Sequence, residues 1–268
     1  MQAFGILCPA HLVFSGTIRY NEAVYLNDYL RRGASMSFLS RLGSVFNYQL
    51  IIILLIRVVA SLLSISIHET SHGLAAYQLG DPTAKRMGRL SLNPIHHIDP
   101  MGLLLLITAG FGWAKPVPVD PRYFRQPKQG MAITSLAGPA SNFILALISA
   151  VLLRLLYELG AGTVEAGFWV MVFFSVMLML NVGLGIFNLF PIPPLDGSKI
   201  AFSVLPDKIY GTILRYERYV MIVLFGMVFL GVLDTPLSFL VNTVVRGLCA
   251  ITGLPLNVLG TLLNDYYY

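Results

Sequence analysis

The sequence predicts an all-α polytopic membrane protein with about five to six transmembrane or half-spanning helices. Of its 268 residues, 56% are hydrophobic and only 12% are charged, whereas a typical soluble domain has about 25% charged residues. Long apolar runs recur along the chain, and about 20 consecutive apolar residues are enough to cross a bilayer as a helix. We therefore expect the chain to lie in a lipid bilayer.

Four long apolar stretches predict spanning helices, because each is long enough to cross the hydrocarbon core. They lie at residues 48–79, 131–157, 168–190 and 210–233. The stretch 101–112 is only about half a span long, and 237–251 predicts a short or interfacial helix.

Two segments depart from this helical pattern. Glycines inside 101–112, followed by Pro-Val-Pro-Val at 116–119, predict a short membrane-associated β-strand region near 111–119. Residues 1–45 predict an N-terminal extension that is interfacial or disordered, because their apolar stretch is too short to span.

The charges predict an orientation and exclude one class of partner. The net charge is +5, and the loops 80–100, 114–129 and 191–218 are basic, whereas the turn 158–167 is acidic. Basic loops favour the cytoplasmic side of a membrane. Nucleic-acid binding is not expected, because the Lys and Arg residues are spread over short loops and form no basic patch.

The sequence His68-Glu-Thr-Ser-His72 is the strongest chemical signal in the chain, and it lies near the end of the first long apolar run. Residues four apart project from the same face of a helix, so both imidazoles can bind one Zn²⁺ while Glu69 takes a proton from the attacking water. Ionisable residues at membrane depth are costly and usually functional. Because the basic loops follow this motif, the site is expected toward the cytoplasmic side.

A third protein ligand is expected, because catalytic zinc is held by three side chains and keeps one open position. Asp196 is the best candidate, since the prolines at 191, 193 and 194 must break the preceding helix and allow this carboxylate to reach inward. Asn188 lies just before the break, where it could donate a hydrogen bond to the oxyanion of a peptide substrate.

Three blocks of the sequence resemble the signature motifs of the site-2 protease family of intramembrane zinc metalloproteases. The blocks are His-Glu-Thr-Ser-His at 68–72, Ala-Gly-Pro-Ala-Ser-Asn at 137–142 and Asn-Leu-Phe-Pro-Ile-Pro-Pro-Leu-Asp-Gly at 188–197. The similarity covers about residues 48–233. No segment is long enough for a PDZ or CBS module, so the chain resembles the compact prokaryotic subgroup.

The resemblance implies a single intramembrane metalloprotease domain over 46–268, with its catalytic core at about 48–205. It implies that this domain binds one Zn²⁺ per chain. The implied ligands are His68, His72 and Asp196, the implied acid/base is Glu69, and Asn142 and Asn188 match asparagines of the active-site region.

The implied function is hydrolysis of a peptide bond within or near a transmembrane segment of a membrane-anchored protein or peptide, that is, regulated intramembrane proteolysis. A helical substrate hides its carbonyls in hydrogen bonds, so the segment 116–119 could unwind it by pairing with it as a strand; the plainer interpretation is a proline-rich loop. The resemblance places such a protein in the inner membrane of a prokaryotic cell, and a homo-oligomer is left open.

Two other classes compete with the protease. A divalent metal-ion transporter would also put His and Asp inside a membrane, but it needs polar sites in series across the bilayer. The spans after Gly197 hold almost no ionisable residues in their centres. A catalytically silent membrane scaffold would have no chemical need for Glu69.

Overall fold

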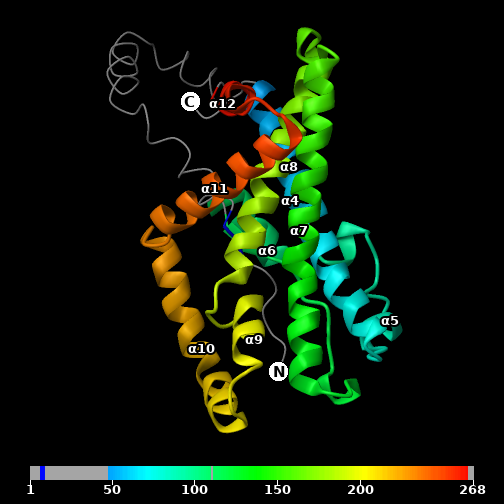
Figure 1. Cartoon of the computed structure of the whole chain (residues 1–268), viewed down its shortest axis with the longest axis vertical. Coiled ribbons are helices and arrows are strands. Elements are labelled where there is room, and N and C mark those ends of the chain that lie inside the picture. The colour runs from blue at the N-terminus through cyan, green and yellow to red at the C-terminus, as the bar shows by residue number, and fades with distance from the viewer. Residues whose placement is uncertain (1–6, 10–47, 110, 265–268) are drawn as a thin grey trace.

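The computed structural model describes residues 7–9, 48–109 and 111–264, and these form a mostly helical structure (Figure 1). The predicted extension 1–45 lies outside the described residues except for one short strand. The elements are β1 (Leu7–Pro9), α4 (Tyr48–Gln78), α5 (Thr83–Arg86), η1 (Pro94–His96), α6 (Pro100–Ala109), β2 (Phe111–Trp113), η2 (Pro121–Tyr123), α7 (Pro127–Glu158), η3 (Ala161–Thr163), α8 (Glu165–Leu189), α9 (Asp196–Phe202), α10 (Asp207–Phe229), α11 (Asp234–Thr252) and α12 (Leu256–Asn264).

Four of the helices are long and apolar enough to cross a membrane: α4, α7, α8 and α11. The helix α11 was expected to be short or interfacial, but it runs for 19 residues. The stretch 210–233 was predicted to span, but α10, which covers most of it, is not among the four helices. Three charged residues, Arg215, Glu217 and Arg218, lie along α10. The helix α6 has 10 residues, which at 1.5 Å per residue is about half the thickness of a hydrocarbon core.

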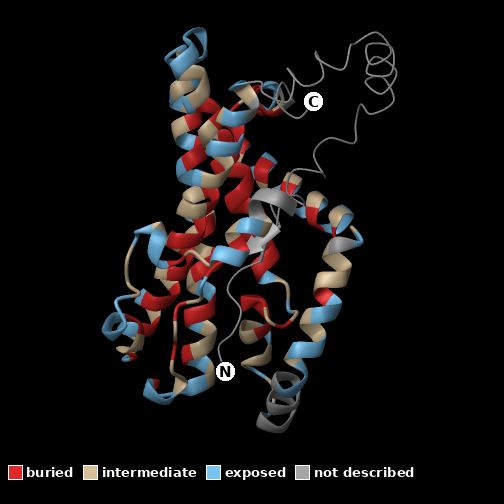
Figure 2. Ribbon diagram, turned by 180° about the vertical axis from the view of Figure 1, so that it is seen from behind, coloured by how far each residue is buried: buried red, intermediate tan, exposed pale blue. Residues whose placement is uncertain are grey.

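The centre of the molecule is α8, which packs against α4, α7 and α11. Its apolar window is 83% buried inside the protein, against 39% for the windows of α4 and α7. A helix that is apolar on all sides is expected in the interior, and Figure 2 shows the buried residues concentrated along this bundle. The remaining apolar faces of α4 and α7 are exposed, as lipid-facing surfaces would be.

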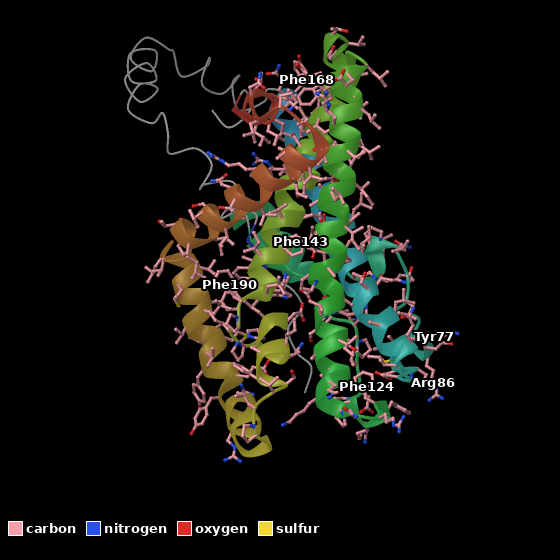
Figure 3. The ribbon with its side chains drawn as sticks, viewed as in Figure 1. Tyr77, Arg86, Phe124, Phe143, Phe168 and Phe190 are labelled. Atoms are coloured by element: carbon pink, nitrogen blue, oxygen red, sulfur yellow. The ribbon has the colours of Figure 1, made fainter. Side chains whose placement is uncertain are left out.

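Close approach of α7 and α8 depends on small residues. In Figure 3, Phe143 of α7 lies at the middle of the bundle, and a Cβ added to Gly185 of α8 would come within 2.9 Å of its ring. Glycine at such a position lets a large ring from the neighbouring helix occupy the space. The asparagines that α7 and α8 carry at this depth can therefore meet across the interface.

The segment that follows α6 is largely non-helical. The strand β2 pairs with β1 in antiparallel register, with Leu7 opposite Trp113 and Pro9 opposite Phe111. Ala114 then forms a bridge with Ile98. Residues 115–119 belong to no strand within the described part of the chain, so the strand itself is limited to three residues of the predicted region 111–119.

The prolines after α8 break the helix as the sequence predicted. The helix α8 ends at Leu189, and α9 begins at Asp196. A Cβ on Gly197 would clash with the carbonyl group of Leu189, so glycine is needed where the chain folds back onto the end of α8. This tight return places the buried carboxylate of Asp196 beside the bundle.

Candidate active site

Three buried side chains converge between α4 and α9. The Nε2 atoms of His68 and His72 lie 3.2 and 3.1 Å from Oδ2 of Asp196. These three residues form a group whose potential ligand atoms all lie within 4.8 Å of one another. The sequence predicted all three as metal ligands, and the structure brings them together.

The two imidazoles share one face of α4, as their spacing of four residues requires. Their ring centroids are 4.5 Å apart and the rings are nearly perpendicular. Helix α7 crosses directly over them at Gly138, where an added Cβ would clash with both Nε2 atoms. The glycine therefore leaves room for the reacting groups at the point where α7 comes closest.

Each imidazole is anchored through its other nitrogen. Nδ1 of His68 lies 2.5 Å from Oδ1 of Asn142, and Nδ1 of His72 lies 2.6 Å from the carbonyl oxygen of Thr134. Both oxygens can only accept, so both Nδ1 atoms must carry the proton. This assignment leaves an unprotonated Nε2 on each ring, directed at the carboxylate.

Both unprotonated Nε2 atoms lie close to Oδ2 of Asp196, at 3.2 and 3.1 Å, and acceptor atoms this close repel unless a cation lies among them. Two neutral imidazoles and one carboxylate, each imidazole oriented by a hydrogen bond at its other nitrogen, are the donor set of a catalytic zinc site. The residues present therefore fit zinc.

Glu69 lies next to His68 on α4 and is 4% exposed. Its Oε2 accepts a hydrogen bond from the backbone N–H of Val117 at 2.8 Å. In the same segment, the N–H of Lys115 donates to the carbonyl of His97 at 2.9 Å. The segment that the sequence singled out at 116–119 is thus tied to the carboxylate beside the metal group.

The two predicted asparagines have different surroundings. Asn142 of α7 is fully buried and contacts His68, as described above. Asn188 is also buried, but its Nδ2 donates to the carbonyl of Leu184 one turn earlier in α8, at 2.9 Å. An amide nitrogen carries two hydrogens, so this bond leaves Asn188 a second donor.

A comparison with protein families agrees with this geometry. The sequence profile described as "Peptidase family M50" matches residues 56–233, which is more than half of the chain. The chain belongs to peptidase family M50, the site-2 proteases. It is a metalloprotease of that family, and His68, His72 and Asp196 form a group that could hold a metal ion.

Similar proteins carry names of the same kind. The chain is 42% identical over 182 residues to "Putative zinc metalloprotease YwhC" of Bacillus subtilis (strain 168), a match that covers 68% of this chain and 81% of that protein. It is 35% identical over 141 residues to "Putative zinc metalloprotease Rip2" of Mycolicibacterium smegmatis, covering 51% of this chain and 52% of Rip2. No solved structure matches the chain.

Sequence reasoning missed several groups of this M50 site. Asn181 of α8 bonds to Asn142, and the carbonyl of Thr134 orients His72. The N–H of Val117 and the missing side chain of Gly138 complete the surroundings. Backbone groups leave no trace in a sequence, but an asparagine within the apolar run of α8 was a detectable signal.

Proposed function

We propose that this M50 protease hydrolyses peptide bonds within or near transmembrane segments of membrane-anchored substrates, as in regulated intramembrane proteolysis. The proposal rests on the convergence of three possible ligand atoms, from His68, His72 and Asp196. The two histidines and the neighbouring Glu69 lie on α4, a helix long enough to cross a membrane. The proposed site binds one zinc ion per chain through His68, His72 and Asp196. The proposed location is the inner membrane of a prokaryotic cell, with the site toward the cytoplasm.

When bound, the zinc supplies Lewis-acid chemistry, polarising the attacking water and the scissile carbonyl. Glu69 acts as general base and then as general acid: it accepts a proton from the attacking water and delivers it to the leaving amine. Because Val117 holds Oε2, Oε1 is the oxygen that exchanges the proton. The second Nδ2 hydrogen of Asn188 donates to the developing oxyanion.

The substrate reaches this site as an extended strand beside residues 114–119. Lys115 and Val117 direct their N–H groups toward the protein, and alternate residues of an extended segment face the opposite edge. Pro116 and Pro118 face that edge with carbonyls alone, because proline has no N–H. A substrate strand would therefore donate hydrogen bonds to these two residues without receiving any from them.

The distribution of metal ligands favours the protease over a transporter. Within the described ranges, the metal-ligating side chains form one group of three or more, whereas a transport path needs polar sites in series. Glu69 lies beside these three ligands but is not one of them. Hydrolysis requires such a carboxylate, whereas passive metal binding does not.

The test measures zinc content and cleavage of a fluorogenic transmembrane peptide by the full chain in detergent. Glu69→Gln is expected to keep the wild-type zinc content and to lose more than about 1,000-fold in cleavage rate, within the 10²–10⁴ that general acid–base catalysis contributes. Glu165→Gln makes the same chemical change at an exposed carboxylate of α8, and it is expected to cleave at the wild-type rate. A wild type that binds no zinc, or a Glu69→Gln variant that cleaves normally, would contradict the proposal.

A further inference from the structure

We propose that Asn181 is a positioning residue of the zinc site, which sets the tautomer of His68 by fixing the orientation of Asn142. This inference rests on the zinc ligands named under the proposed function, but it is independent of the substrate. Asn181 lies on α8, and His68 and Asn142 lie on α4 and α7. All three side chains are 0% exposed, so no bulk water competes for their hydrogen bonds.

The orientation of Asn181 is determined by a backbone carbonyl. Its Nδ2 lies 2.8 Å from the carbonyl oxygen of Met177 and 2.8 Å from Oγ of Ser64. Because a carbonyl can only accept, the nitrogen end of the amide must point there. Oδ1 of Asn181 therefore points the other way, toward α7.

The orientation passes from Asn181 to Asn142 and then to His68. Oδ1 of Asn181 can only accept, so the atom that faces it at 2.8 Å must be Nδ2 of Asn142. Oδ1 of Asn142 then faces Nδ1 of His68 at 2.5 Å, and the imidazole must carry its proton on that nitrogen. The result is an unprotonated Nε2 aimed at Oδ2 of Asp196.

Without Asn181, no hydrogen bond among the described residues would hold the Asn142 amide in this orientation, and the carboxylate of Asp196 can accept from a protonated Nε2 of His68. The nitrogen and oxygen ends of the Asn142 amide are nearly equal in size, and a reversed amide would donate to Nδ1 of His68. The imidazole would then carry its proton on Nε2, and a protonated Nε2 cannot bind a metal. Loss of a hydrogen bond that does not touch the ligand itself would thus lower zinc affinity.

A purely structural role for Asn181 predicts something different. A buried asparagine can simply hold two membrane helices together, and its loss would then lower stability without changing the state of one imidazole. Two measurements separate these roles. The first asks whether the effects of substituting Asn181 and Asn142 on zinc affinity depend on each other, and the second determines the tautomer of His68.

The first experiment is a double-mutant cycle on zinc affinity, measured by competition with a chelator on the full chain in detergent. Asn181→Leu is expected to weaken zinc binding by about 10–100-fold, as loss of an outer hydrogen bond to a ligand does. Asn142→Leu is expected to weaken it at least as much. The double variant is expected to bind no more weakly than Asn142→Leu alone, because Asn181 acts through Asn142.

Two further variants serve as rescue and control. As a buried, protonated carboxyl group, Asn181→Asp still accepts from Asn142 and can donate its O–H to the carbonyl of Met177. Zinc binding is therefore expected within about threefold of wild type, since the orientation of Asn142 is retained. Ser175→Ala removes another fully buried polar group of α8, one whose hydrogen bond among the described residues is to its own helix, at Val172. Zinc affinity is expected to stay at the wild-type value.

The second experiment is ¹⁵N NMR of histidine-labelled, zinc-free protein at a pH where the imidazoles are neutral; the sequence contains five histidines. The Asn181→Leu variant is expected to shift the His68 signals from the Nδ1–H to the Nε2–H tautomer. Wild-type zinc affinity in Asn181→Leu, losses that multiply in the double variant, or an unchanged tautomer would overturn the role of Asn181. A wild type without zinc would instead overturn the proposed function.

Discussion

The two histidines of α4 are anchored from the same helix, α7, by acceptors of different kinds. His72 bonds to the backbone carbonyl of Thr134, and His68 bonds to the side-chain amide of Asn142. A backbone carbonyl cannot reverse, but an amide can, and the amide of Asn142 has a further hydrogen bond, to Asn181. An anchor that could reverse therefore needs a support of its own.

The largest effect is expected where the two anchoring arrangements meet, at Gly138. A Cβ added at Gly138 would clash with Nε2 of both imidazoles. Gly138→Ala is therefore expected to reduce zinc affinity by more than the roughly 10–100-fold that one lost outer hydrogen bond costs. Chelator competition measures this loss. The matched control is Gly247→Ala in α11, where an added Cβ meets nothing within 4 Å; there, stability should rise by up to about 1 kcal/mol. Equal zinc affinity in both variants would show that α7 can move away from the histidines.

The sequence predicted what depends on local geometry. The spacing of His68 and His72 fixes a shared helix face, and the prolines after Asn188 require a break that frees Asp196. Both predictions were made from neighbouring residues, and α4 and α8 confirm them.

The network behind His68 could not be predicted in this way. It needs Asn142 and Asn181 on helices whose facing sides are set by packing, through contacts such as that of Phe143 with Gly185. The sequence drew attention to Asn188, seven residues after Asn181, because it belongs to a recognisable motif. The structure bonds Asn188 to its own helix, so its role stays a prediction.

The third ligand offers a smaller test, because it is held by a turn instead of a helix face. A Cβ on Gly197 would clash with the carbonyl of Leu189, so Gly197→Ala should push α9 and Asp196 away from the histidines. Zinc affinity is expected to fall by about 10-fold, at the low end for indirect support of a ligand, and the unfolding temperature should fall with it. If affinity fell while His68 changed tautomer in the NMR spectrum, the two supports would be coupled, and the separation drawn here would be wrong.

The smallest effect is expected at Thr134, although its carbonyl is one of the two anchors. Its hydroxyl is buried and has no hydrogen-bond partner among the described residues, and only its backbone carbonyl contacts His72. Thr134→Val keeps that carbonyl and replaces the hydroxyl by a methyl group of similar size. Zinc affinity should stay at the wild-type value, and the free energy of unfolding should rise by about 1 kcal/mol, because the cost of an unpaired buried hydroxyl disappears.

Asn142→Leu is the matched change at the other anchor, since it removes a side chain that itself contacts the imidazole. Chelator competition and thermal unfolding of the two variants, side by side, compare the backbone anchor with the side-chain anchor. A loss of zinc affinity in Thr134→Val as large as that in Asn142→Leu would mean that the backbone of α7 shifts with its side chains. His72 would then be held no more firmly than His68, because a carbonyl on a shifting backbone fixes neither the position nor the tautomer of the ring it anchors.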